Sequence, residues 1–128
     1  MIIGLGTDII DNRRIKKILN KFGDKFKKRC FSINEIKRSE KKNNFVSSFA
    51  KRYAAKEACA KALGTGLARG VFWKDIEVTN NLYGKPLIKL HKKSITRLKN
   101  LSTKECSIEV SLSDEINYSI ATVIIFEK

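Results

Sequence analysis

Residues 49–66 read Phe49-Ala-Lys-Arg-Tyr-Ala-Ala-Lys-Glu-Ala-Cys-Ala-Lys-Ala-Leu-Gly-Thr-Gly66, and we expect the rest of the chain to be organised around this stretch. It is rich in Ala, Lys and Glu, which favour helix, and two glycines at its end stop the helix. At about 100° per residue, one arc of this helix is apolar and should face the core. The residues of that arc are Phe45, Val46, Phe49, Tyr53 and Ala60. The stretch therefore predicts a long central helix.

Glu57 lies at the edge of this apolar arc, among Ala50 and Ala54, and not on the solvent face. An unpaired buried carboxylate is costly, so Glu57 needs a partner. The stretch alone leaves two interpretations open. In the first, Glu57 forms an ordinary i,i+4 surface pair with Lys61. In the second, Glu57 holds a cation or a proton at the floor of a functional site.

Composition fits one globular domain over residues 1–128, because a chain of this length with 42% hydrophobic residues can bury a core. The longest apolar run, residues 120–126, is too short to span a bilayer, and the N-terminus lacks the pattern of a signal peptide. The chain has three cysteines, an odd number with no paired short spacing. This cysteine content argues against a disulfide framework or a zinc site and favours a reducing cytoplasm. We expect no membrane partner.

The net charge of +14 predicts an acidic partner, such as a phosphorylated ligand, an acidic protein, nucleic acid or an anionic membrane. Nine of the basic residues fall within residues 12–29, where Asp24 is the one acidic residue. A run of charge often forms only a solvated helix face. Because acids are nearly absent from this segment, a docking surface for an anionic partner is the alternative that we favour.

Asp8 is a second carboxylate in an unexpected place. It lies within residues 2–10, a mainly apolar run of strand type. Either Asp8 or Asp11 could cap the helix that follows, and Asp11 suits that role better because it adjoins the helical segment. The role of Asp8 is therefore left unexplained by local structure.

The remaining segments predict an α+β fold, with an antiparallel sheet packed against the long central helix. In the first half of the chain, apolar residues at helical spacing and a capping box predict helices that include the central one. In the second half, alternating apolar residues indicate strands. The expected strands are 2–10, 75–79, 86–90, 108–112 and 118–126, and the expected helices follow residues 11, 32 and 44 and span 91–101. Since residues 118–126 are apolar on both faces, they should form a central strand.

The chain carries no Ser-His-Asp arrangement, no GxGxxG and no Walker A motif. Its Gly64-Thr65-Gly66 turn follows a helix C-terminus, so it is not a P-loop, in which phosphate meets a helix N-terminus. Two carboxylates completed by substrate phosphates are a usual way to hold Mg²⁺. Asp8 and Glu57, with Lys61 beside the turn, therefore suggest phosphoryl-type transfer, which needs mostly positioning and charge neutralisation.

Four segments resemble the holo-acyl-carrier-protein synthases, the small members of the phosphopantetheinyl transferase superfamily. They are residues 4–15, 49–66, 84–86 and 111–118, and the resemblance runs in the same order from residue 2 to the end. The runs Gly-x-Asp-Ile and Lys-Glu-Ala-x-x-Lys-Ala-x-Gly-Thr-Gly carry most of it. The resemblance implies a 4′-phosphopantetheinyl transferase-like fold.

The same resemblance implies a Mg²⁺-dependent reaction that serves fatty acid biosynthesis. A 4′-phosphopantetheine group would pass from coenzyme A to a serine of apo acyl carrier protein, and adenosine 3′,5′-bisphosphate would leave. Similar proteins are trimers, with the coenzyme site in the cleft between adjacent protomers. Acyl carrier proteins are strongly acidic, which fits the basic segment of residues 13–29.

The resemblance also implies a role for each residue of this chain that matches a family motif. Asp8 and Glu57 would ligate Mg²⁺, and Lys61 would stabilise the charge that develops on the bridging oxygen. Glu57, acting directly or through a metal-bound water, would take the proton of the acceptor serine. The remaining matches are coenzyme A contacts at Gly64, Thr65, Gly66, Lys85 and Pro86, and carrier-protein contacts at Arg14, Lys17 and Lys21.

One position departs from many relatives. They have His where this chain has Asp114, whereas other relatives carry Asp-Glu there, as this chain does. By the resemblance, the change from His removes a cationic contact to the coenzyme A 3′-phosphate. We therefore assign Asp114 no binding role and expect Lys or Arg elsewhere to serve.

A small nucleic-acid-binding protein is the competing hypothesis. It explains the charge but not Asp8 or Glu57, and the sequence has no interleaved aromatic platform for single strands. An inactive relative that serves as a scaffold is disfavoured because both carboxylates and Lys61 are present.

Overall fold

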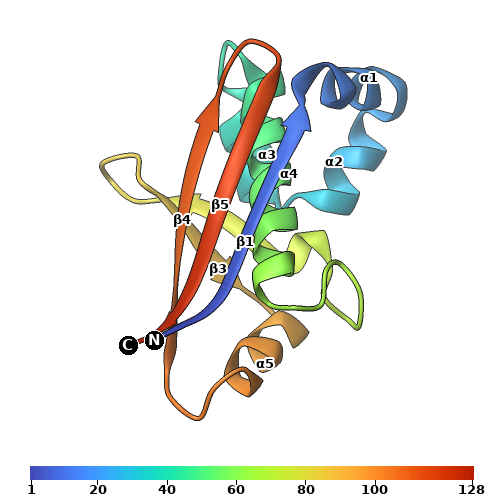
Figure 1. Ribbon diagram of the computed structural model, residues 1–128. Coiled ribbons are helices and arrows are strands. Elements are labelled where there is room, and N and C mark those ends of the chain that lie inside the picture. The colour runs from blue at the N-terminus through green and yellow to red at the C-terminus, as the bar shows by residue number, and fades with distance from the viewer.

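Helix α4 (Phe45–Ala62) lies across one face of a three-stranded antiparallel sheet. The sheet consists of β1 (Ile2–Asp11), β5 (Tyr118–Glu127) and β4 (Cys106–Asp114), with β5 in the centre. The computed structural model describes residues 1–128, and Figure 1 shows α4 behind the sheet with the two chain ends side by side. The predicted α+β class, the central helix and the central C-terminal strand are confirmed.

The other elements surround α4 (Figure 1). Helices α1 (Asn12–Phe22) and α2 (Asp24–Cys30) lie on one side, and α3 (Ile33–Glu40) packs near the start of α4. A second, two-stranded sheet of β2 (Ile76–Asn80) and β3 (Pro86–Leu90) projects on the other side, preceded by the short 3-10 helix η1 (Trp73–Asp75). Helix α5 (Lys93–Asn100) follows β3.

Local sequence signals account for most helix ends. The Asp11 carboxylate accepts a hydrogen bond from the Arg13 amide at 2.9 Å, as predicted for a cap. The Arg13 side chain also binds Asp11 and holds the pKa of that carboxyl at about 2. Ser32 and Glu35 form the predicted capping box. Gly23, with φ of 50°, divides the first helical segment into α1 and α2.

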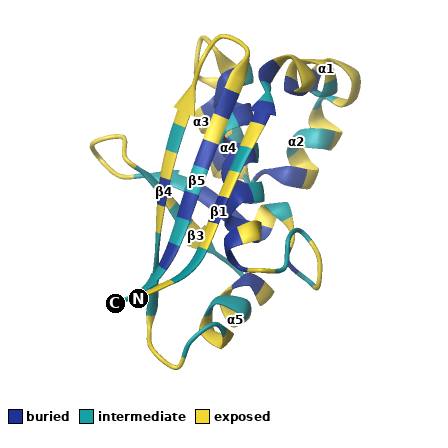
Figure 2. Ribbon diagram, in the orientation of Figure 1, coloured by how far each residue is buried: buried dark blue, intermediate teal, exposed yellow.

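Glycines in β1 allow the strand and α4 to meet backbone to backbone. A Cβ at Gly6 would overlap the carbonyl oxygen of Ala58, and a Cβ at Gly4 would overlap that of Ala62. The face of α4 toward the sheet consists of small residues, and most of this helix is buried (Figure 2). The position of Asp8 and Glu57 relative to each other is therefore set by direct backbone packing.

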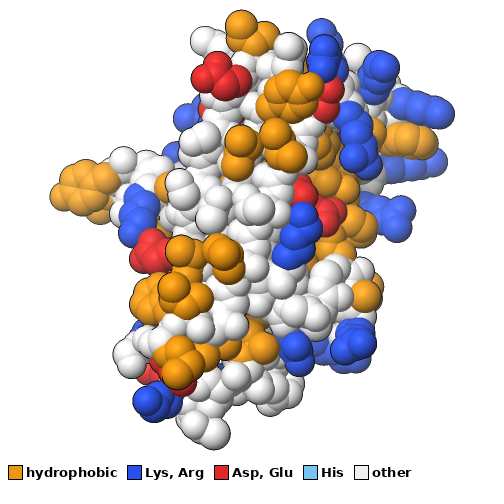
Figure 3. Space-filling view, viewed as in Figure 1, with side chains coloured by type: hydrophobic (Ala, Val, Ile, Leu, Met, Phe, Trp, Pro, Cys, Tyr) orange, Lys and Arg blue, Asp and Glu red, His pale blue; other side chains and the backbone are white.

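The opposite face of the three-stranded sheet has no helix over it (Figure 1). Leu5 and Ile9 of β1 are 65% and 61% exposed, and Ile120 of β5, paired with Ile9, is also exposed. Figure 3 views this face and shows hydrophobic side chains gathered over the strands. No helix of the chain is long and apolar enough to cross a membrane.

Cysteine reactivity should differ sharply among the three free thiols. Burial raises the pKa of Cys30 to about 11 and that of Cys59 to about 12, whereas Cys106 is only half-buried. Because the thiolate is the reactive form, we expect an aromatic disulfide reagent at pH 8 to modify Cys106 alone in the native protein. All three thiols should react in guanidinium. Rapid modification of Cys59 without denaturant would contradict this.

Candidate functional site

Asp8 and Lys61 meet between β1 and α4. The Lys61 Nζ donates to Asp8 Oδ1 at 3.1 Å and to the carbonyl oxygen of Thr7 at 2.9 Å. The Asp8 side chain is 18% exposed, and that of Lys61 is 52% exposed. Fifty-three positions separate the two residues in sequence, so their pairing was not visible there. The ion pair lies at the surface, where a ligand can reach both charges.

Glu57 lies one turn before Lys61 on α4 and is half-buried. The Glu57–Lys61 pair, the first interpretation of the sequence, is not formed, because Lys61 turns to β1 instead. Glu57 has no ion pair of its own. Burial first, and then the nearby Glu57 carboxylate, raise the pKa of Tyr53 to about 12. Because it has no cationic partner, the Glu57 carboxylate is available to bind a metal.

The chain has no cluster of three or more His, Cys, Asp or Glu side chains placed to hold a metal. A cage made entirely of protein ligands is thus absent. Mg²⁺ commonly binds through one or two carboxylates and takes its other oxygens from water and substrate phosphates. The donor set of Asp8 and Glu57 fits that pattern.

The glycine turn follows α4 directly. Gly64 and Gly66 have φ of 80° and 59°, a conformation that L side chains rarely adopt, and the Thr65 hydroxyl donates to the Gly66 carbonyl at 2.7 Å. The Arg97 Nε donates to the Leu63 carbonyl at 2.8 Å. A cation at this end opposes the negative pole of the helix dipole. Arg97 comes from α5, and no local motif in the sequence marks it for this contact.

A basic cavity of about 480 Å³ opens on the other side of α4. Its cations are Arg38, Lys42, Lys51 and Arg52. The Lys51 side chain lies 3.4 Å from Asp114, so that pair is largely neutral, whereas Arg38 and Lys42 have no ion pair. We name these four cations and the residues around them the basic cavity; the others are Asn43, Asn44, Ser47, Ser48, Val78, Asn80, Gly84, Pro86 and Leu112.

Arg52 forms the floor of the basic cavity and is 5% exposed. Its Nη1 donates to the Ser48 hydroxyl at 2.8 Å, and its Nη2 donates to Asn80 Oδ1 at 3.1 Å. The Nε is buried and has no partner. Arg52 therefore contributes positive charge beneath the cavity, and its guanidinium is held in place by Ser48 and Asn80.

The two predicted loop contacts differ. Pro86 lines the basic cavity together with Gly84. Lys85 does not line it, because its Nζ lies 3.0 Å from Glu109 of β4. Pro86 was expected from the sequence. The cations Arg38, Lys42 and Arg52 were not, because they come from different parts of the chain and meet only in the fold.

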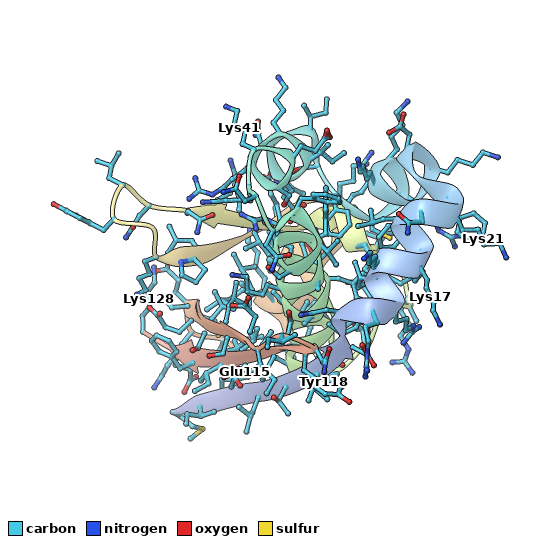
Figure 4. The ribbon with its side chains drawn as sticks, turned by 90° about the horizontal axis from the view of Figure 1, so that it is seen from above. Lys17, Lys21, Lys41, Glu115, Tyr118 and Lys128 are labelled. Atoms are coloured by element: carbon cyan, nitrogen blue, oxygen red, sulfur yellow. The ribbon has the colours of Figure 1, made fainter.

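The basic cavity and the Asp8–Glu57–Lys61 group lie on different sides of α4. Arg52 and Glu57 are five positions apart, which is about 140° around the helix axis. Figure 4 looks down on α4 and shows the β2–β3 hairpin on one side and α1 on the other. A single chain therefore presents two separate groups of polar residues.

The basic face of α1 is exposed. Lys17 and Lys21 point away from α4 (Figure 4), and Arg14 on the same helix is exposed and has no ion pair. Arg13 differs, because its guanidinium is bound to Asp11. Phe22 adds an exposed aromatic side chain beside Lys21. The predicted partner-binding residues thus share one accessible surface, which combines positive charge with an apolar contact.

Comparisons with known proteins identify the family. A profile of the 4′-phosphopantetheinyl transferase superfamily matches residues 4–123. The holo-[acyl-carrier-protein] synthase of Rhizobium meliloti (strain 1021) is 48% identical over 127 residues, which cover 98% of this chain and 91% of that protein. The synthase of Agrobacterium fabrum is 47% identical and is covered to 95%.

Solved structures of the same kind are also similar. The holo-[acyl-carrier-protein] synthase of Neisseria meningitidis superposes with a TM-score of 0.87 at 32% identity, covering 99% of this chain and 100% of that one. The Helicobacter pylori enzyme in complex with coenzyme A gives 0.82 at 32% identity, covering 95% and 99%. On the profile match, the relatives of nearly half identity and the similarity of fold, the chain belongs to the 4′-phosphopantetheinyl transferase superfamily.

Proposed function

We propose that this chain transfers the 4′-phosphopantetheine group of coenzyme A to a serine of apo acyl carrier protein. The observation that carries the proposal is the Asp8–Lys61 pair beside the unpaired Glu57, in a chain whose relatives are named holo-[acyl-carrier-protein] synthase. The serine oxygen forms a bond to the phosphorus that carries pantetheine. The bond from that phosphorus to the bridging oxygen breaks, and adenosine 3′,5′-bisphosphate leaves. Because the acceptor is an acyl carrier protein, the reaction would serve fatty acid biosynthesis.

Mass spectrometry tests the reaction directly. Apo acyl carrier protein incubated with coenzyme A, Mg²⁺ and the chain should gain the mass of one phosphopantetheine, on serine. Unchanged carrier protein, with an established transferase as positive control, would contradict the proposal.

Asp8 and Glu57 are the residues that would hold Mg²⁺. When bound, the ion neutralises the pyrophosphate charge and favours departure of the bisphosphate. Lys61 lies within hydrogen-bond distance of Asp8, and its ammonium would donate to the bridging oxygen as charge develops there. Glu57, directly or through a water, takes the proton of the serine.

The basic cavity would take the nucleotide end of coenzyme A. Arg38 and Lys42 supply cationic donors for its 3′-phosphate, and the charge of Arg52 at the cavity floor adds to the attraction. These cations would make the contact to the 3′-phosphate that the His of many relatives is expected to make and that Asp114 does not support. The 3′,5′-bisphosphate named in the Bacillus anthracis relative, in complex with CoA (3′,5′-ADP), is the kind of group that such a cavity fits.

One coenzyme would meet the basic cavity of one protomer and the carboxylates of its neighbour. The position of the two groups on different sides of α4 supports this, because the site is incomplete within one chain. The exposed apolar face around Leu5, Ile9 and Ile120 supports assembly. We propose the trimer that the resemblance implies.

Mixed assemblies test this shared site. Chains with Asp8→Asn lack one group, and chains with Arg38→Ala and Lys42→Ala lack the other, so each should be nearly inactive alone. Co-expressed, random mixing should restore about a quarter of the wild-type activity, since that fraction of interfaces joins two intact groups. Asp8→Asn mixed with Glu57→Gln is the matched control and should restore nothing. Activity no greater than the sum of the separate variants would place the site within one chain.

The basic face of α1 would dock the acidic carrier protein. Arg14→Ala should raise KM for the carrier protein about tenfold with little change in kcat or in KM for coenzyme A, because surface charge acts mainly on encounter. Added salt should mimic the change in the wild-type enzyme. The same substitution at Arg69, on an exposed loop after α4, is the control. A defect confined to KM for coenzyme A would contradict the docking role.

We place the reaction in the cytoplasm. The three cysteines are free, and two of them are buried in the core, which supports a reducing compartment.

A further inference from the structure

A buried ion pair joins α3 to α4. The Lys56 and Glu35 side chains are both 0% exposed, and the Lys56 Nζ donates to Glu35 Oε1 at 2.7 Å. The same ammonium donates to the carbonyl oxygens of Trp73 at 2.9 Å and Ile76 at 2.5 Å. All three N–H donors of the Lys56 ammonium therefore have acceptors inside the fold. Lys56 is the sequence neighbour of Glu57 in a lysine-rich helix, but its side chain is fully buried.

Glu35 is equally well satisfied. Its Oε1 accepts from the Ser32 amide at 2.9 Å, and its Oε2 accepts from the Val78 amide at 3.1 Å. Burial lowers the pKa of Lys56, and the charge of Glu35 opposes that change. The pair thus connects α3, α4, η1 and β2 through hydrogen bonds to charged groups.

The elements joined by this pair are the walls of the basic cavity. Helix α3 carries Arg38, and α4 carries Arg52. Strand β2 carries Val78 and, two residues on, Asn80, which accepts from Arg52. The hydrogen bond from Val78 to Glu35 therefore fixes the strand that orients the cavity floor. Lys56 and Glu35 do not line the cavity themselves.

A buried ion pair is a poor means of gaining stability, because desolvation of both charges offsets most of their attraction. It does fix geometry, since each charge must find all of its partners. We propose that Lys56 and Glu35 form a positioning pair that holds the cations of the basic cavity at the spacing needed for the 3′-phosphate of coenzyme A. This inference rests on the proposed function of the basic cavity.

The test compares coenzyme A with 3′-dephospho-coenzyme A as donors. The ratio of their kcat/KM values reports contacts to the 3′-phosphate, whereas a loss of folded enzyme lowers both values equally. In the double variant Lys56→Met and Glu35→Gln, the amide can still bond to the Val78 amide, and the charges are gone. We expect the ratio to fall about tenfold, as for loss of one hydrogen bond to a charged group.

Matched variants make the result decisive. Removing the exposed Lys128–Glu105 pair, 3.0 Å apart, by Lys128→Met and Glu105→Gln should leave the ratio unchanged. Arg38→Ala, which removes a cavity cation, should lower it. If the double variant does not fold, Lys56→Met alone gives the measurement, because Glu35 then keeps its hydrogen bonds from the Ser32 and Val78 amides.

The outcomes separate the two proposals. An unchanged ratio in the folded double variant, together with a lowered ratio in Arg38→Ala, would overturn the positioning role and leave the cavity assignment intact. An unchanged ratio in Arg38→Ala would overturn both. Absence of transfer from either donor by the wild-type chain would contradict the proposed function itself.

Discussion

Replacing Asp8 with Asn is expected to lower kcat/KM for phosphopantetheine transfer by about a thousandfold. The amide keeps the shape of the side chain but removes the charge that Lys61 binds and that a Mg²⁺ ion would need. Transfer to apo acyl carrier protein should be measured by mass spectrometry over a range of Mg²⁺ concentrations. Glu57→Gln should give a loss of similar size.

Folding should not explain that loss. The Lys61 side chain of the pair is 52% exposed, and an ion pair at the surface adds little stability, so circular dichroism and the urea midpoint should stay near the wild-type values. Asp24→Asn, at an exposed carboxylate of α2, is the matched control and should keep full activity. Wild-type turnover by Asp8→Asn at saturating Mg²⁺ would show that the metal assignment is wrong.

Replacing Gly6 with Ala is expected to destabilise the fold by more than about 3 kcal/mol. The new methyl group would overlap the carbonyl oxygen of Ala58. Because that oxygen belongs to the helix backbone and the methyl group is fixed to the strand backbone, neither a rotamer change nor a small shift relieves the overlap. Urea unfolding followed by circular dichroism, at a fixed chain concentration, gives the change in the free energy of unfolding.

Gly84→Ala is the matched comparison. It adds the same methyl group where nothing lies within 4 Å, and its cost comes only from φ of 86°. That strain should amount to about 1 kcal/mol. Equal destabilisation by the two substitutions would show that β1 and α4 are not in direct backbone contact.

The fold could be predicted in large part because its signals are local. The capping box at Ser32, the cap at Asp11 and the glycine turn after α4 each depend on a few adjacent residues. The alternation along β4 and the apolar run of β5 likewise gave their places in the sheet.

For the candidate site, the residues themselves pointed first to the two carboxylates. Asp8 and Glu57 were visible because each is a charge in an apolar setting. The sequence did not show which carboxylate Lys61 binds, since the choice between Glu57 and Asp8 depends on how β1 approaches α4. The resemblance to a known family, rather than periodicity, gave these residues their roles.

The basic cavity and the buried pair were missed for a different reason. Arg38 and Arg52 come from helices that meet only after folding. Lys56 stands in a lysine-rich helix, where a lysine is expected at the surface, and a sequence does not show which lysine turns inward. Long-range packing decides this.

The placement of two polar groups on different sides of α4 has a genetic consequence. In the proposed assembly, each chain borders two sites and contributes a different group to each. A chain that is damaged in both groups yet still assembles would silence both of the sites that it borders. Such an allele should act as a dominant negative, whereas chains damaged in different groups should complement one another in the same cell.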